Sequence, residues 1–388
     1  MIKYKWSAIR LSLFLTLFST VTSRAEVKVG DLGALALGID TSLYSSDNIT
    51  LDSSSQGDTV FSILPTINFR NSGGIMKVDA FIGKEFIFYD KFSQNNSEDL
   101  KSNIAIKYPY KSSGENLSIF AEGGINDYNL PISNSLGVGK VVSLTNTDLS
   151  IGGKYYLNDK ITFDCEVSYM DTDSRTLNYA DLNRLTLPFS IKYYYDESIS
   201  GGLGCRFRTT QIGNETISPK ADSDDLAVYF ILENDRSSVW TYEIEIGIQK
   251  RDFIDDEAFT DSYGVFASGT ANWFISDRSN LKGEISNEYG TTLANQSTET
   301  SGTSLELNHI PTDRLRLLLG LSYDDIKYDQ IIGGRVDERS KLYCAADYVM
   351  LGGNWILRAI IGHTHNYSSI KVANYDSNYL SFRSIIVF

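Results

Sequence analysis

Apolar and polar residues alternate along most of this chain with the two-residue period of a β-strand. In WTYEIEIGIQ, residues 240–249, Trp240 and every second residue through Ile248 form an apolar face, whereas Thr241 and every second residue through Gln249 form a mostly polar face. The segments ITFDCEVSYMD (161–171) and LRLLLGLSYDD (315–325) repeat this pattern, and helical periodicity is scarce. About eighteen such segments, from residues 32–44 to residues 376–388, predict an all-β protein.

The connections between these segments alternate between short and long. Short turns are expected near residues 71–74, 158–160, 235–238 and 311–314, and longer loops near residues 45–57, 129–145 and 291–299. A membrane-spanning up-and-down barrel has short turns at one end and longer loops at the other. The pattern therefore predicts one transmembrane antiparallel up-and-down β-barrel of about 18 strands.

A soluble β-sandwich would also alternate, but its connection lengths follow no order. Three tryptophans, Trp240, Trp273 and Trp355, lie on apolar faces within a few residues of a short turn. This placement is typical of the aromatic girdle at a membrane interface. A barrel in the bilayer must also close, because no backbone group there can stay unpaired. We therefore prefer the barrel, and Pro65 and Pro188 inside predicted strands indicate either bulges or different strand limits.

The first 25 residues have the features of a cleaved secretory signal peptide. Basic residues flank an apolar run at 11–21, and Ser23 and Ala25 supply the small residues of a cleavage site. We expect cleavage before Glu26, which leaves residues 26–388 as the barrel domain. Losing four cations would change the formal net charge from −14 to −18, which argues against a nucleic-acid partner. The three cysteines are far apart and odd in number, so no disulfide framework is indicated.

The polar faces of the predicted strands would line the interior of the barrel. Acidic and basic residues assigned to these faces are nearly balanced, which favours cross-strand ion pairs in a wet interior. The alternative is a charged constriction that selects the permeating solute. The pore-lining candidates are Arg206, Arg208, Glu243, Glu245, Lys282, Glu284, Arg316, Asp324 and Arg358.

The three histidines do not indicate an enzyme. A hydrolytic site needs a nucleophile, a base and a group that orients the base. His309 adjoins a predicted short turn, and His363 and His365 continue the outward parity of Trp355 without a nucleophile motif nearby. Two histidines at positions i and i+2 of a strand are also a weak metal signal. We therefore predict no catalytic activity, no cofactor and no metal site.

Three pieces near the N-terminal end resemble a known family. They are GIDTSLYSSDNIT (38–50), GDTVFSILPTINF (57–69) and EFIFYDKFSQNNSEDL (85–100). Together they resemble the beta-barrel porin family associated with exopolysaccharide loci, in a pattern that covers about 75 residues. The resemblance implies an integral outer-membrane barrel for the secretion of an extracellular polysaccharide, working with a periplasmic export partner.

We accordingly expect a passive outer-membrane pore with both termini in the periplasm. Exopolysaccharide export is the first hypothesis, and a general or substrate-selective diffusion porin is the second. A structural or adhesive surface barrel with a plugged lumen is the third. The loop at 129–145 is the predicted gate. The C-terminal SFRSIIVF (381–388) predicts the closing strand, with Leu380, Phe382 and Ile386 facing lipid and Ser384 as a small departure. Phe388 resembles the C-terminal signature that the barrel-assembly machinery recognises.

Overall fold

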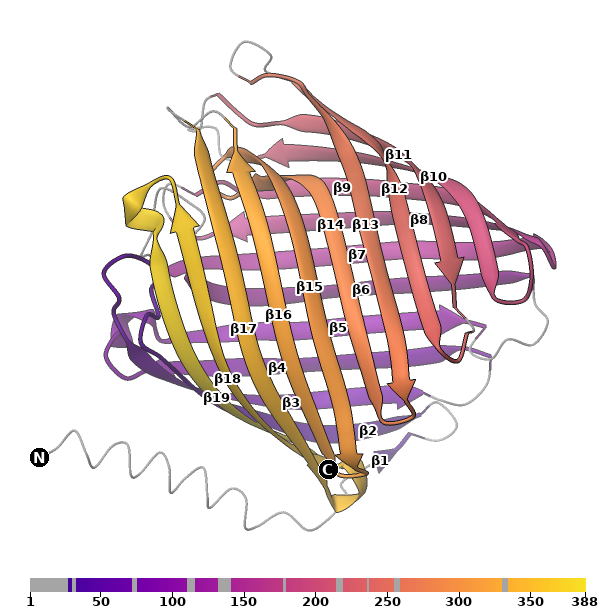
Figure 1. Cartoon of the computed structure of the whole chain (residues 1–388). Helices are drawn as coiled ribbons and strands as arrows, with labels where there is room; N and C mark the ends of the chain where they lie inside the picture. Colours follow the sequence, from indigo (N-terminus) through magenta and orange to yellow (C-terminus); the bar gives the residue numbers. More distant parts are fainter. Residues whose placement is uncertain are drawn as a thin grey trace, which may run out of the picture.

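The computed structural model describes residues 27–29, 33–71, 75–109, 116–131, 141–176, 179–213, 219–235, 237–254, 259–329 and 334–388. These residues form one antiparallel sheet of 19 strands, of which β2 to β19 close into a barrel of 18 strands (Figure 1). The predicted signal peptide lies outside the described residues. Within them, no helix is long and apolar enough to cross a membrane.

The strands are β1 (Val27–Lys28), β2 (Ala34–Ser46), β3 (Asp58–Asn71), β4 (Lys77–Tyr89), β5 (Ser97–Tyr108), β6 (Leu117–Pro131), β7 (Val141–Asn158), β8 (Ile161–Ser174), β9 (Leu182–Tyr194), β10 (Ile199–Ile212), β11 (Ser223–Asn234), β12 (Trp240–Phe253), β13 (Ser262–Ser276), β14 (Ser279–Thr292), β15 (Gln296–Thr312), β16 (Leu315–Tyr328), β17 (Arg335–Met350), β18 (Trp355–Ser368) and β19 (Tyr375–Val387). Single 3-10 turns occur at η2 (Ser93–Asn95), η3 (Leu351–Gly353) and η4 (Lys371–Ala373).

The first and last long strands close the barrel. β19 pairs with β2 from Tyr379 opposite Ser46 to Val387 opposite Gly38. The backbone N–H of Phe388 donates to the carbonyl of Leu37 at 2.8 Å, so even the last residue is held. A closed sheet has no free edge. The predicted closing role of the C-terminal strand is therefore confirmed.

The two ends of the barrel differ in their connections, as predicted. At the short-turn end, strands are joined by two-residue turns such as 159–160, 277–278 and 313–314. The long-loop end carries connections such as 47–57 and 90–96. The connection between β14 and β15 is an exception, because only residues 293–295 separate the two strands. The longer loop predicted at 291–299 is therefore wrong there, and a tight hairpin takes its place.

The outer face of the barrel is apolar and carries aromatic residues at the short-turn end. Trp240 at the start of β12 lies directly opposite Trp273 of β13. Their rings stack at 5.3 Å with an angle of 4° between their planes. Trp355 begins β18 at the same end of the barrel. This placement agrees with the interfacial girdle that the sequence predicts.

The predicted outward-facing residues of the tail strand share one face of β19. Leu380 and Phe382 are exposed on the outer face, as expected. Ile386 lies on the same outer face, directly opposite Trp355, and is only 9% exposed there. Ser384 accepts a hydrogen bond from Trp355 Nε1 at 3.0 Å. The small polar residue on the apolar face is therefore the acceptor for a girdle tryptophan.

Pro65 and Pro188 interrupt the ladders beside them without shifting the register. The ladder between β3 and β4 stops at Ile63 opposite Phe86 and resumes at Thr66 opposite Gly83. The ladder between β8 and β9 has a similar gap around Pro188. The residues on both sides of each gap keep one register, so the first of the two predicted alternatives, bulges, is wrong. Each proline lacks a donor for the ladder on one side only.

Several large rings on the inner face lie flat against a glycine of the preceding strand. A Cβ atom built on each of these glycines would stand 2.2–2.3 Å from an atom of the ring. No side chain other than hydrogen fits beneath such a ring. The pairs are Tyr229 on Gly204, Tyr343 on Gly320 and Tyr379 on Gly362.

β14 leaves the barrel wall before it ends. Its ladder with β13 stops at Ala267 opposite Asn287. β13 nevertheless stays paired with β12 as far as Ser262, and β14 stays paired with β15 as far as Thr292. Figure 1 shows β13 continuing past the point at which β14 turns away. The β14–β15 hairpin therefore bends away from the wall at the long-loop end.

Candidate functional site

The tip of the β14–β15 hairpin contacts two other connections at the long-loop end. The carbonyl of Leu293 accepts a hydrogen bond from the N–H of Ala180 at 2.8 Å. Asn295 Oδ1 accepts from the N–H of Ala221, and Asn295 Nδ2 donates to the carbonyl of Pro219, both at 2.7 Å. Ala180 precedes β9 and Ala221 precedes β11, so the tip lies across the mouth of the barrel on the β9–β13 side.

Apolar contacts hold the same tip in place. Leu293 packs against one buried cluster formed by Val142, Leu144 and Tyr179 and against a second formed by Ala180, Leu182 and Ile212. β9 and β14 are five strand positions apart, which is roughly 24 Å along the wall. Contacts between them require the hairpin to cross the interior. The in-folded segment is thus this hairpin. Of the predicted gate at 129–145, residues 132–140 lie outside the described residues, and the flanking residues belong to β6 and β7.

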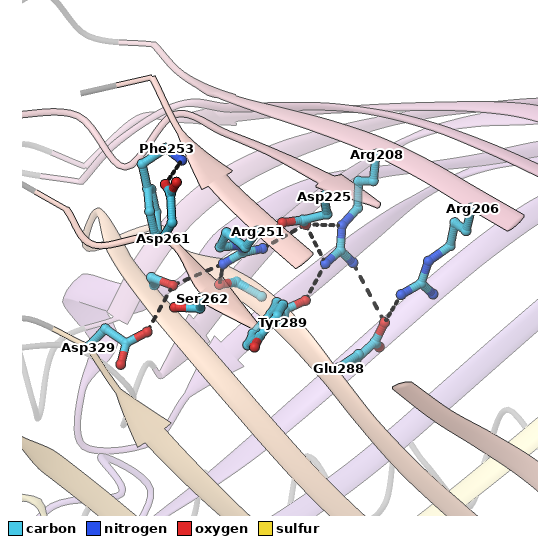
Figure 2. Close-up of polar contacts among 12 residues, drawn as sticks. Arg206, Arg208, Asp225, Arg251, Phe253, Asp261, Ser262, Glu288, Tyr289 and Asp329 are labelled. Carbon is cyan, nitrogen blue, oxygen red and sulfur yellow. Dashed lines mark hydrogen bonds and ion pairs between the residues drawn. The ribbon is translucent and has the colours of Figure 1, made fainter. Parts of the chain in front are cut away.

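A buried arrangement of two arginines and one carboxylate lies beneath the hairpin (Figure 2). Arg208 Nε donates to Asp225 Oδ2 at 2.8 Å, and Arg251 Nε and Nη2 donate to the two oxygens of Asp225 at 2.6 and 2.8 Å. Arg251 is fully buried, and the other two residues are each 5% exposed. The three residues come from adjacent strands and occupy directly opposite positions. The arrangement is therefore built into the wall by strand register.

The remaining donors of these arginines reach the hairpin. Arg208 Nη2 donates to the carbonyl of Tyr289, and Arg251 Nη1 donates to the carbonyl of Gly290 at 2.6 Å. Arg251 Nη1 also lies 3.0 Å from Ser297 Oγ, which in turn donates to Asp329 just beyond the end of β16. Burial raises the pKa of Asp329, and this hydrogen bond opposes the rise. The two arginines therefore connect β10 and β12 to the segment of β14 that has left β13.

The wall is sharply bent at β10–β14. Arg206 Nη2 lies 3.2 Å from Glu288 Oε2, and its guanidinium carbon lies 4.7 Å from the ring centre of Phe266. β10 and β14 are four strand positions apart, roughly 19 Å along the wall. Their side chains meet because the wall bends and because Glu288 lies on the part of β14 that has left β13. A small core of Ala227, Tyr229, Ile231 and Phe266 fills the inside of that bend.

A second charged layer lies nearer the short-turn end, around Lys192. Its Nζ is 2.8 Å from Glu233, 3.4 Å from Glu243 and 3.6 Å from Asp164. The side chain of Lys192 is 8% exposed, so the ammonium group is largely enclosed by carboxylates. Glu243 and Glu245, both predicted to line the pore, help to line a cavity of about 320 Å³ beside it. This layer carries two cations, Lys154 and Lys192, against five acids, Asp164, Glu166, Glu233, Glu243 and Glu245, a balance of −3.

The other candidates from the sequence lie on the same inner face but in separate ion pairs or, for Arg316, in a hydrogen bond to an amide. The structure does not bring all nine together at one site, and their role as pore-lining residues stays a prediction. Their contacts are Lys282 with Glu284 at 2.5 Å, Arg316 with Asn308 at 2.7 Å, Asp324 with Arg339 at 3.0 Å and Arg358 with Asp347 at 2.6 Å.

Arg184 was missed by the sequence interpretation. Its Nε atom is buried without a hydrogen-bond partner, and it forms no ion pair with any residue in the described part of the chain. Arg184 lies directly opposite Thr210, and Thr210 is two residues after Arg208 in β10. Arg184 also lines a cavity of about 470 Å³ together with Asn126, Ser168 and Thr186. The alternation in LNRLTL, residues 182–187, would have placed Arg184 on the inner face.

Arg184, Arg206, Arg208 and Arg251 together form the arginine cluster. Asp225 and Glu288 are the carboxylates that contact it, so the local balance is four cations against two anions, or +2. Asp225 and Arg251 were also absent from the predicted set. On this side of the interior, a basic layer therefore lies near the long-loop end and an acidic layer lies nearer the short-turn end.

Comparisons with known proteins agree with this architecture. No family model and no characterised sequence matches the chain. Among solved structures, OpdK of Pseudomonas aeruginosa with vanillate superimposes with a TM-score of 0.52 at 8% identity, over 91% of this chain and 99% of that one. P. aeruginosa OccK2 (OpdF) with glucuronate gives 0.51 at 8% identity over 91% and 98%, and a BenF-like porin from Pseudomonas fluorescens Pf-5 gives 0.52 at 8% over 92% and 100%.

The chain has the fold of a porin. At 8–9% identity the resemblance concerns the fold alone. Within the porin fold, His363 and His365 contact Asn378 and Asp376 on the outer face, away from the arginine cluster. Among the described residues, no group of three or more histidine, cysteine, aspartate or glutamate side chains is arranged to hold a metal ion.

Proposed function

We propose that this chain is an integral outer-membrane diffusion porin with both termini on the periplasmic side. The closed 18-strand barrel, its apolar outer face and its tryptophan girdle support a membrane-spanning role. Short turns face the periplasm and longer loops face outward in barrels of this kind. The similar solved structures include the outer membrane protein OpdK and a BenF-like porin.

We further propose that the porin favours small solutes that carry a carboxylate. The observation that carries this step is Arg184, a largely enclosed cation that has no carboxylate partner among the described residues and faces a cavity. A guanidinium fork matches a carboxylate geometrically and binds it through two hydrogen bonds. Vanillate and glucuronate, present in two of the similar structures, both carry a carboxylate.

Exopolysaccharide export has less support. The similar structures include a BenF-like porin, and no observation in the described residues favours a polymer substrate. The export partner therefore stays a prediction from sequence resemblance. An adhesive barrel with a fully plugged lumen would conduct no ions. A measurement of ion conductance through the reconstituted barrel therefore tests that alternative.

Reconstitution of the full chain tests the proposed function. Liposome swelling should be faster with glucuronate than with a neutral hexose of similar size. Arg184→Gln should slow glucuronate about tenfold relative to the hexose, because a hydrogen bond to a charged group contributes about 1.5–3 kcal/mol. Arg278→Gln, the same change in the 277–278 turn, is the matched control. Absence of ion conductance would overturn the porin, and equal solute rates in wild type and Arg184→Gln would overturn carboxylate preference.

A further inference from the structure

Beyond Asn287, towards the long-loop end, β14 is separated from β13 by about the length of a side chain. The hydroxyl of Tyr289 ends 2.7 Å from the position of a Cβ atom built on Gly264 of β13. The ring of Tyr289 therefore spans the space between the two strands, and its side chain is only 3% exposed. The guanidinium carbon of Arg251 lies 5.3 Å from the centre of the same ring. We call this gap between β13 and β14 the notch, and the side chain of Tyr289 fills it.

The two strands that border the notch have matching lengths. The last pair in their ladder is Ala267 opposite Asn287. Continuing this register by single steps pairs Val265 with Tyr289 and, at the ends of both strands, Ser262 with Thr292. Neither strand would overhang the other. β13 and β14 could therefore pair along their whole length, an arrangement that we call the zipped state.

Side-chain parity also fits the zipped arrangement. Leu281 and Ile285 of β14 point to the outer face, and Tyr289 lies an even number of residues away from both. Zipping would place Tyr289 on the outer face beside Tyr263 and Val265, which are both strongly exposed. A tyrosine at the rim of a membrane barrel is well placed at the interface. The residue that now fills the notch would thus have a suitable position in either state.

The contacts that hold the hairpin inward can be exchanged without dismantling the wall. Arg208, Asp225 and Arg251 lie on three adjacent strands, so their ion pairs do not depend on β14. Movement of β14 would release the arginine hydrogen bonds to the carbonyls of Tyr289 and Gly290, the ion pairs of Glu288 with Arg206 and Arg208, and the contacts of the tip. Ladder hydrogen bonds with β13 would replace them.

We infer that the β14–β15 hairpin is a hinged gate with two states. In the closed state described here, the tip crosses the mouth and β14 is unzipped from β13 beyond Ala267. In the open state, β14 zips onto β13 as far as Ser262 and Thr292, and the tip leaves the mouth. This inference rests on the proposed function, because a gate has meaning only for a conducting pore. It adds the moving element and the residues at which it moves.

Paired cysteines test the two states separately. The three native cysteines, Cys165, Cys205 and Cys344, are first replaced by serine. Val265→Cys with Tyr289→Cys can form a disulfide only in the zipped state, because a disulfide requires Cα atoms within about 7 Å. Ala180→Cys with Leu293→Cys reports the closed state. Val228→Cys with Ile248→Cys, opposite positions in the intact β11–β12 ladder, is the control for reactivity and for membrane assembly.

Two readouts separate failure of the gate from failure of the pore. Disulfides are followed by the masses of linked peptides, and conductance is followed in planar bilayers before and after reductant. We expect Val265–Tyr289 oxidation to raise conductance about twofold because the mouth widens, and Ala180–Leu293 oxidation to hold the lower value. No Val265–Tyr289 disulfide under conditions that link the control pair overturns the inference, as does a disulfide without a change in conductance. If the disulfides form as expected but the barrel never conducts, the proposed function is overturned. The two-state hinge is still supported in that case.

Discussion

Arg251 and Asp225 form a buried bidentate ion pair, in which Arg251 Nε and Nη2 donate to the two carboxylate oxygens at 2.6 and 2.8 Å. The same carboxylate also accepts from Arg208, so one anion serves two enclosed cations. In the closed state, where these side chains are buried, the remaining guanidinium donors also need acceptors within the protein. The carbonyls of Tyr289 and Gly290 supply them. The charge of the wall and the position of the hairpin are therefore coupled.

Removing the shared charge should destabilise the barrel. Asp225→Asn leaves Arg208 and Arg251 buried without their counter-ion, and we expect the free energy of unfolding to fall by about 3 kcal/mol. Urea unfolding in lipid vesicles, followed by tryptophan fluorescence, measures the change. Asp224→Asn removes the neighbouring charge on the opposite face of β11 and is the matched control. An equal loss in the two variants would show that Asp225 has no special role.

Close backbone approach at the bend should make one glycine irreplaceable. A Cβ atom on Gly247 of β12 would lie 1.9 Å from the carbonyl oxygen of Val228, a contact that no side-chain movement relieves. We expect Gly247→Ala to reduce the fraction of barrel that migrates as a folded species in unheated electrophoresis samples. Gly283→Ala, where the nearest atom is the Leu305 Cδ2 at 3.4 Å, should fold normally. Normal folding of both variants would contradict the tight bend.

The acidic layer should tune ion selectivity. Lys192→Met removes the cation enclosed by Glu233, Glu243 and Asp164 and changes the local balance from −3 to −4. The reversal potential in a KCl gradient should therefore shift toward that of potassium. Lys192→Arg should retain the wild-type value, and Lys160→Met in the 159–160 turn should leave it unchanged. A shift of the same size in Lys160→Met would locate the effect outside the interior.

The C-terminal residue should matter for assembly and not for permeation. Deletion of Phe388 removes its hydrogen bond to Leu37 and the terminal aromatic residue at the seam. We expect less barrel in the outer-membrane fraction, with unchanged single-channel conductance in the molecules that do assemble. Phe388→Tyr keeps both features and should assemble normally. Wild-type amounts of the deletion variant in the membrane would exclude Phe388 as an assembly signal.

Strand parity made much of this fold readable from the sequence. Neighbours two apart in a strand share a face, so the alternation around Glu243 and Arg208 was enough to assign both to the inner face. Closure by the last strand also followed, because an apolar strand at a chain end must be paired on both edges in a membrane. The same reasoning could have found Arg184 and Arg251.

The departure of β14 from β13 could not be read in this way. Residues 262–266 and 288–292 alternate as if both strands simply continued, and Tyr289 has the parity of an outer-face residue although it is buried. Its burial depends on contacts between the hairpin tip and connections that are far away in sequence. Such contacts leave no local period. The ion pairs of Asp225 likewise require the register of three strands, which a single sequence does not supply.

The tyrosines that lie on glycines have a consequence for how much solute the barrel can pass. Tyr229, Tyr343 and Tyr379 each lay their ring sideways over the neighbouring strand, so they add to the thickness of the wall and project little toward the axis. A bulky residue at these positions therefore leaves the bore almost as wide as a small one would. Replacing the glycine beneath each ring, and not the ring itself, is the change that would push an aromatic group into the path of the solute.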